Sequence, residues 1–332
     1  MREETIGIGA LPLDSGDVLP AVEQRVTIYG TPNAERSNVV LVTHALTGSS
    51  RAAEWWPGIA GDGGLFDERH WCVVGVNALG SCYGSTGPTS LASDGIAYGN
   101  RFPRVSVGDM VRAQMLALDR LGFEDLAFVI GGSLGGMQAL QWALAAPQRV
   151  RNAIVVGAHD GLRAMSIALC ALQREALELD AAGGLRLARK IAMLTYKSDG
   201  LLDKRHGRRP DRRKGDCFDV EGYLDVQADR LAARMDARSY DVLTQAMMTF
   251  DAQDAGTNGY TGRRPGLTFV GIGSDWLFPA DEVREAAGRF AARGFDARYL
   301  LLESSHGHDA FLAETAALRA LLEPVVAQCR VC

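Results

Sequence analysis

Long apolar runs are missing from this chain of 332 residues. No stretch approaches the ~18 consecutive apolar residues that a membrane-spanning helix needs, so we expect no membrane contact. The first residues, Met1–Glu4, lead into no apolar core of the kind that secretory signal peptides carry. We therefore expect a cytoplasmic protein.

A large excess of charge of one sign is also missing. Lysine and arginine number 35, and aspartate and glutamate number 40, which leaves a net charge of −5 at pH 7. We expect no nucleic-acid partner for such a mildly acidic chain. The composition is 47% hydrophobic and 23% charged, which is ordinary for a globular protein and argues against a disordered, collagen-like or coiled-coil chain.

Cysteine is scarce and scattered. The six cysteines do not gather into the ligand set of a structural zinc site, so we predict no metal and reduced thiols. Cys329 and Cys332 stand three residues apart at the tail, and we interpret that spacing as chance.

The chain instead has alternating strand and helix patterns. An alternating stretch at Gln24–Tyr29 predicts an edge strand, and short apolar runs predict strands buried on both faces. Helical patterns lie between them, for example at Val107–Leu121 and Gly136–Ala146. This alternation predicts an α/β fold with a mostly parallel sheet flanked by helices. The predicted buried strands are Asn38–Thr43, Trp71–Asn77, Leu126–Ile130, Ala153–Gly157, Leu267–Ile272 and Arg298–Leu302.

The alternation stops near residue 160 and returns at Leu267. The chain between them, from Gly161 to Asp254, is rich in Ala, Leu, Arg and Gln at helical spacing and poor in β-branched runs. We predict that residues 1–160 and 261–332 form one α/β core domain and that residues 161–260 form an inserted helical lid.

A glycine-flanked serine stands where one predicted strand meets a helix. The strand Leu126–Ile130 is followed by Gly131-Gly132-Ser133-Leu134-Gly135 and then by a helical pattern, which is the context of a Gly-x-Ser-x-Gly nucleophile elbow. The flanking glycines leave room for the sharp turn, and the helix N-terminus favours a developing oxyanion. A phosphate-binding turn is the alternative, but neither Gly-x-Gly-x-x-Gly nor a Gly-Lys-Ser/Thr ending is present.

A nucleophilic serine needs a base, and histidine is the usual one. In folds with such an elbow the chain order is serine, then acid, then histidine, which excludes the two histidines before Ser133. His159 follows Ser133 too closely to leave room for the strand that carries the acid. His206 lies in the basic lid segment, where no predicted strand would hold it. This leaves His306 and His308, which follow the last predicted strand, and the local sequence supports either. The excluded histidines are His44, His70, His159 and His206.

The acid and the oxyanion donors follow from strand ends. Asp275 stands just after the strand Leu267–Ile272 and is the candidate acid; the alternative is a turn or N-cap aspartate. The backbone N–H of Leu134 is one expected oxyanion donor. Leu46, just after the first buried strand, supplies the second expected N–H.

Further motifs resemble one family. They include the His44–Gly48 loop, the Asn77–Pro88 segment, the Asp109–Gln114 segment and the Gly307–Leu312 segment, together with the elbow. From about residue 38 to 315 the chain resembles the homoserine O-acyltransferases of the α/β-hydrolase superfamily, most often homoserine O-acetyltransferases. The resemblance implies the α/β-hydrolase fold.

The resemblance also implies a ping-pong acyl transfer in methionine biosynthesis. Ser133 takes an acetyl group from acetyl-CoA, a co-substrate rather than a cofactor, and the hydroxyl of L-homoserine then accepts it. The family pattern assigns the base to His308 and the substrate ammonium to Asp309. It also implies a homodimer through the lid helices, and the apolar spacing at Ser239–Phe250 is compatible with this, although core packing explains that spacing equally well.

Two lid residues match the family's substrate contacts. Arg189 and Tyr196 are seven residues apart, which is two helical turns, so both lie on one face. A guanidinium can hold an α-carboxylate through two parallel hydrogen bonds, so Arg189 is the expected carboxylate clamp; a surface arginine is the alternative. The basic segment Lys204–Lys214 has two interpretations, a solvated loop or a patch for an anionic group such as a coenzyme A phosphate.

Departures from the family pattern leave alternatives open. This chain has Leu134 where many members have Met and Ser81 where they have Gly, and its lid looks short. The small Gly48 beside the oxyanion loop favours homoserine over serine. The alternatives are a succinyl-CoA donor or an L-serine acceptor on the same scaffold, an ester hydrolase with water as acceptor, and a non-catalytic binding protein, because one fold hosts many activities.

Overall fold

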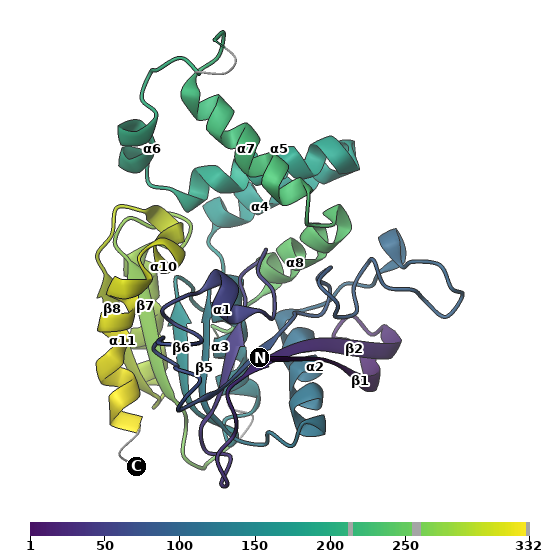
Figure 1. Ribbon diagram of the computed structural model, residues 1–332, viewed down its shortest axis with the longest axis vertical. Helices are drawn as coiled ribbons and strands as arrows, with labels where there is room; N and C mark the ends of the chain where they lie inside the picture. The colour runs from purple at the N-terminus through teal and green to yellow at the C-terminus, as the bar shows by residue number, and fades with distance from the viewer. Residues whose placement is uncertain (212–214, 254–259, 330–332) are drawn as a thin grey trace.

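The computed structural model describes residues 1–211, 215–253 and 260–329 and is built around one eight-stranded sheet (Figure 1). The strand order is β1-β2-β4-β3-β5-β6-β7-β8. β2 pairs antiparallel with β1 and β4, and all other pairs are parallel, which confirms the prediction of an α/β fold with a mostly parallel sheet. The strands are β1 (Arg2–Pro12), β2 (Val18–Tyr29), β3 (Val39–Thr43), β4 (Cys72–Val76), β5 (Leu126–Gly132), β6 (Val150–Val156), β7 (Gly266–Ile272) and β8 (Asp296–Leu302).

Helices cover both faces of the sheet because the central strands are apolar on both sides. In β3, Val39 and Leu41 belong to one buried cluster, and Val40 and Val42 belong to the other. The first cluster packs against α2 (Val107–Arg120), α3 (Leu134–Ala145) and α9 (Ala280–Ala292). The second packs against α1 (Ala52–Trp55), α10 (Ala310–Ala313) and α11 (Thr315–Cys329).

The N-terminal strands differ from the prediction. We expected an edge strand at Gln24–Tyr29, but β2 is the second strand, and β1 lies at the edge. β1 gave no clear sequence pattern because most of its residues are exposed and its register shifts at Gly9. An edge strand has a neighbouring strand on one side only and leaves much of its surface exposed, so it needs no continuous apolar run.

Five helices lie between β6 and β7, and Figure 1 shows them gathered beyond the ends of the central strands. They rest on the core near their two connections: Ser166 Oγ donates to Leu277 O (2.8 Å) and Ala252 N donates to Asp160 O (2.7 Å). Most apolar residues of α8 are buried within the chain, so core packing accounts for the spacing at Ser239–Phe250. The helices are α4 (Ala164–Leu179), α5 (Ala181–Tyr196), α6 (Asp199–Arg205), α7 (Asp219–Ala232) and α8 (Ala237–Thr249).

Two short 3₁₀ helices complete the secondary structure of the described ranges, at Gly99–Arg101 and Gly307–Asp309. None of the helices in the described part of the chain is long and apolar enough to cross a membrane. The described residues also contain no cluster of three or more His, Cys, Asp or Glu side chains that could hold a metal ion.

Candidate active site

Ser133 occupies a strained turn between β5 and α3. Its φ of 57° and ψ of −126° lie in a region that side-chain-bearing residues rarely adopt, and such strain costs about 1–3 kcal/mol. The hydrogen bond from Ser133 N to Val156 O (2.9 Å) helps to hold the turn. The elbow glycines are required by space: a Cβ on Gly135 would lie 2.1 Å from Thr43 O, and one on Gly131 would lie 2.3 Å from the Gly135 backbone.

Asp275 and His308 form a buried pair at the ends of β7 and β8. The Nδ1 atom of His308 lies 2.7 Å from Asp275 Oδ2. The other oxygen, Oδ1, accepts hydrogen bonds from the N–H groups of Leu277 (2.9 Å) and Phe278 (3.0 Å). Asp275 therefore has both of the roles considered from the sequence. Its Oδ1 atom holds the turn, and its Oδ2 atom faces the histidine.

His308, rather than His306, is the histidine beside Asp275. His306 Nδ1 lies 2.5 Å from Glu314 Oε1 instead, and His306 does not line the cavity that contains Ser133. The imidazole of His308 stacks on Phe278 at 5.3 Å between ring centres and meets Phe311 edge-on at 5.6 Å. These rings fix its orientation.

Opposing effects set the pKa of His308. Burial lowers the pKa, because it disfavours the charged imidazolium, but the charge and hydrogen bond of Asp275, together with the charge of Asp309, raise it above its ordinary value. A raised pKa makes the imidazole a stronger base.

The excluded histidines lie elsewhere in structural roles. His44 accepts a hydrogen bond at Nε2 from Ala78 N (2.9 Å) and donates from Nδ1 to Ala45 O (2.8 Å); burial lowers its pKa to about 4, so it stays neutral. His159 is buried beside Asp160 and Glu282. His206 pairs with Asp219 at 2.8 Å.

Ser133 and His308 line one cavity of about 190 Å³ under the inserted helices. The Nε2 atom of His308 is buried without a hydrogen-bond partner among the described residues, so the Ser133–His308 hydrogen bond is not closed in this state. Catalytic hydrogen bonds are often long until substrate binds. Leu46 lines the same cavity, and Leu134 is the first residue of α3, where a backbone N–H has no intrahelical acceptor.

Arg189 and Tyr196 of α5 also line this cavity. The guanidinium carbon of Arg189 lies 5.2 Å from the centre of the Tyr196 ring, and burial raises the pKa of Tyr196 to about 12, so the phenol stays protonated. The Nε atom of Arg189 is buried with no hydrogen-bond partner, and no carboxylate of the described chain is within ion-pair distance of its guanidinium. Among the residues that the structure describes, Arg189 thus has no counter-ion at the cavity wall.

Asp309 lines the cavity but already has a partner. Lys197, the residue after α5, places its Nζ 2.7 Å from Asp309 Oδ2. The sequence analysis did not single out Lys197, and its position directly after Tyr196 is the signal that could have found it. A substrate ammonium at Asp309 must share or replace this ion pair.

Arg234 is a cavity residue that the sequence analysis missed. It lies in the turn between α7 and α8 and donates from Nη1 to Thr47 O (2.7 Å) and to Tyr83 Oη (2.5 Å). No motif marks it, because only the packing of the insertion on the β3–α1 loop brings it to the cavity.

The basic segment 204–214 does not reach this cavity in the part that the structure describes. Lys204 and Arg205 end α6, and Arg205 Nη2 lies 3.3 Å from His306 Nε2. Arg208 lies over the ring of Phe218 at 5.3 Å. Residues 212–214 of the segment, and Cys332 of the tail pair, lie outside the described residues.

Comparison with known sequences identifies relatives along nearly the whole chain. Residues 38–315 match the α/β-hydrolase fold family. A homoserine O-acetyltransferase of Thermobifida fusca is 39% identical and is aligned over 96% of this chain and 92% of its own length. A homoserine O-succinyltransferase of Dechloromonas aromatica is 38% identical over 92% of this chain and 91% of its own length.

Solved structures agree on the fold. The homoserine O-acetyltransferase of Staphylococcus aureus superimposes with a TM-score of 0.81 at 26% identity, covering 98% of this chain and 95% of that chain. Esterase E22 superimposes with a TM-score of 0.87 at 24% identity, covering 99% of both chains, and at that identity the likeness concerns the fold alone. The sequence relatives carry the more specific information, and by them this chain is a member of the homoserine O-acyltransferase family, within the α/β-hydrolase fold.

Proposed function

We propose that this protein transfers an acetyl group from acetyl-CoA to the hydroxyl of L-homoserine, a step of methionine biosynthesis. The observation that carries the proposal is the content of one cavity of about 190 Å³, which holds Ser133 and His308 together with Arg189 and Asp309. An uncompensated guanidinium and a carboxylate are complementary to the two charges of an amino acid. An ester hydrolase has no need of such a pair.

In the first half-reaction Ser133 is the nucleophile. His308 Nε2 takes the proton of Ser133 Oγ as the oxygen attacks the thioester carbonyl, and Asp275 holds the imidazole and stabilises its charge. The N–H groups of Leu46 and Leu134 receive the oxyanion. The carbon–sulfur bond then breaks, and the thiolate takes the proton from His308, leaving free thiol and acetylated Ser133.

In the second half-reaction the amino acid replaces the thiol. Arg189 binds the α-carboxylate beside the Tyr196 ring, and Asp309 receives the ammonium. His308 removes the proton of the substrate hydroxyl, which attacks the acyl-enzyme ester; Ser133 Oγ leaves and takes that proton back. Water competes with the hydroxyl, so the five inserted helices are proposed to act as a lid that excludes it.

Donor and acceptor identity are the finer parts of the proposal. Relatives of similar identity are named for acetyl transfer and for succinyl transfer. We favour acetyl because acetyltransferases outnumber succinyltransferases among the eight sequence relatives compared and because the cavity is small. The reaction as written uses side chains and backbone N–H groups, with acetyl-CoA as co-substrate and no other cofactor. We also propose a cytoplasmic location, as expected for an enzyme of amino-acid biosynthesis.

A thiol-release assay tests the proposal. Acetyl-CoA or succinyl-CoA is paired with L-homoserine, L-serine or no acceptor, and Ser133→Ala serves as the inactive control. Fast release only with acetyl-CoA plus L-homoserine is the expected result. A preference for succinyl-CoA or L-serine would retain the mechanism and change the substrate, whereas equal release without any acceptor would replace the transferase by a hydrolase.

A further inference from the structure

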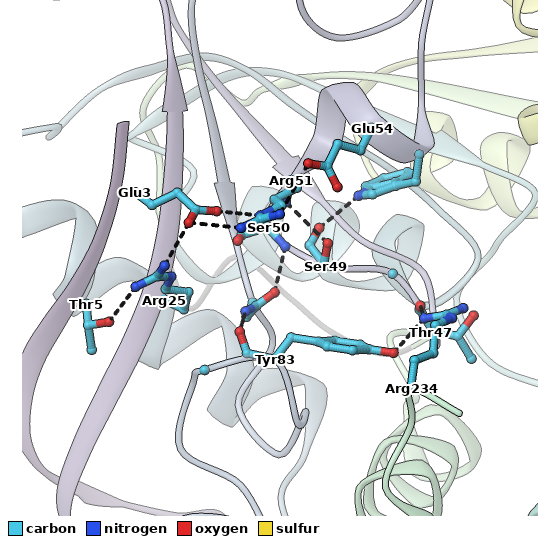
Figure 2. A pocket seen from close by; sticks show the side chains of 14 residues that line it. Glu3, Thr5, Arg25, Thr47, Ser49, Ser50, Arg51, Glu54, Tyr83 and Arg234 are labelled. Atoms are coloured by element: carbon cyan, nitrogen blue, oxygen red, sulfur yellow. Dashed lines mark hydrogen bonds and ion pairs between the residues drawn. The ribbon is translucent and has the colours of Figure 1, made fainter. Parts of the chain in front are cut away.

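A larger pocket opens beside the Ser133 cavity, at the junction of β1, β2, the β3–α1 loop and the insertion. It has a volume of about 660 Å³ and is shown in Figure 2. The two cavities share four wall residues, Thr47, Gly48, Trp55 and Arg234. We name this space the outer pocket and these four residues its neck. The two cavities are therefore adjacent, and the proposal below takes the neck as the passage from Ser133 to the outer pocket.

The outer pocket has more positive than negative side chains. Arg25, Arg51 and Arg234 line it, against two carboxylates, Glu3 and Glu54. Glu3 is shared, because its oxygens lie 2.7 Å from Arg25 Nη2 and 2.6 Å from Arg51 Nε. One carboxylate thus serves two guanidinium groups at the end of the pocket away from the neck, as Figure 2 shows.

Arg234 stands at the neck without a carboxylate partner in the described chain. Its Nη1 atom is engaged by Thr47 O and by the hydroxyl of Tyr83. These contacts fix the guanidinium but do not neutralise its charge. Arg51 adds a partly exposed cation further out, with Glu54 as a weaker second partner at 3.3 Å.

We propose that the outer pocket binds the phosphopantetheine and nucleotide end of the acyl-CoA donor, with its phosphates opposite Arg51 and Arg25 and its arm passing Arg234. The inference rests on the proposed function, because it takes a coenzyme A thioester as the donor. An acyl group and an amino acid fill a cavity of about 190 Å³, so the rest of a long donor lies outside it. Guanidinium groups bind phosphate oxygens through paired, charge-assisted hydrogen bonds. The described residues of the basic segment 204–214 line neither cavity.

The test compares two donors that differ only in phosphates and nucleotide. Acetyl-CoA and S-acetylpantetheine are each assayed with L-homoserine, and the ratio of their kcat/KM values is the readout. We expect Arg51→Gln to lower this ratio about tenfold, the size of one charged hydrogen bond. We expect Glu54→Gln to raise the ratio severalfold, because it removes a negative charge facing the phosphates. The matched control is Arg101→Gln: this exposed arginine pairs with Asp94 at 2.6 Å outside the outer pocket, so its ratio should equal that of the wild type.

Arg51→Gln should lower the ratio of kcat/KM values and Glu54→Gln should raise it. A folding defect cannot produce this result, because misfolding cannot raise the ratio. Ratios equal to the wild type in both variants would overturn the outer pocket as the donor site while leaving the transferase intact. Absence of thiol release from acetyl-CoA by the wild type with every acceptor would overturn both the proposed function and the site.

Discussion

The two oxygens of Asp275 hold different parts of the site in place. Oδ1 fixes the loop after β7 through two backbone N–H groups, and Oδ2 fixes the imidazole of His308. Removing the charge of Asp275 therefore changes both the orientation and the basicity of His308.

This arrangement predicts how activity depends on pH. His308 must be neutral to act as base, so kcat/KM falls as pH drops through its pKa, which lies above the ordinary value. In Asp275→Asn the contributions of Asp275 to this raised pKa are gone, and only the charge of Asp309 still opposes the lowering by burial. The acidic limb should therefore move to lower pH as the maximal rate falls by at least about a hundredfold. A pH profile of kcat/KM measures both effects. An unmoved limb would show that Asp275 does not set the pKa of His308.

Arg189 offers a second test at this scale. Arg189→Ala should raise the KM for the amino acid at least about tenfold and leave the KM for the acyl donor nearly unchanged, because it removes a bidentate carboxylate contact. The control is Arg186→Ala on the same helix, whose guanidinium pairs with Asp229 and does not line the cavity. Steady-state kinetics with each substrate varied in turn separates the two constants, and an unchanged amino-acid KM would remove Arg189 from the clamp.

At the scale of elements, the elbow depends on how closely α3 approaches β3. Gly135 packs against the backbone of Thr43, and Thr43 Oγ1 donates to Gly135 O at 2.7 Å. A side chain at this position would push the first turn of α3 away from the strand and displace the Leu134 N–H.

We predict that Gly135→Ala lowers the free energy of unfolding by about 2–4 kcal/mol, because its Cβ meets backbone that cannot rotate away. The matched control is Gly288→Ala, an exposed glycine inside α9 whose Cβ would meet nothing within 4 Å. That change should stabilise the protein by about 0.5–1 kcal/mol, since alanine favours helix. Urea unfolding measures both, and equal effects would show that the close approach at the elbow does not matter for stability.

Elements whose residues are buried in the same way along their whole length could be predicted from the sequence. The strands β3 to β8 could be located because most are apolar on both faces, and the elbow because its glycines are needed for space. β1 could not be located in this way, because an edge strand depends on pairing with its neighbour more than on an apolar pattern of its own. The acid and the two candidate bases followed from chain order, but the choice between His306 and His308 needed the family motif. Only tertiary packing brings Lys197 to Asp309 and Arg234 to the cavity wall.

At the scale of the whole molecule, the insertion presents an apolar stripe to solvent. On α4, Met165, Leu172 and Leu179 are exposed at intervals of seven residues, and the neighbouring α5 exposes Leu187 and Leu194 at the same interval. Seven residues make two helical turns, so each set lies along one face. Leu179 is the most exposed of these side chains, at 85%, and an exposed row of apolar side chains is typical of an interaction surface. The family resemblance implies a homodimer through the lid helices, and we propose this stripe on α4 and α5 as its contact.

Leu172→Asp should break this contact. A charge at the centre of the stripe must be desolvated in the dimer, which should raise the dimer dissociation constant at least about tenfold and give monomers at low micromolar concentration. Sedimentation velocity measures the change. The control is Leu116→Asp on α2, a leucine that is 38% exposed and lies away from the insertion, which should leave the wild-type mass unchanged. Because α5 also carries Arg189, a monomeric variant with a raised KM for the amino acid would show that assembly holds the clamp in place, whereas a dimeric Leu172→Asp variant would move the interface elsewhere.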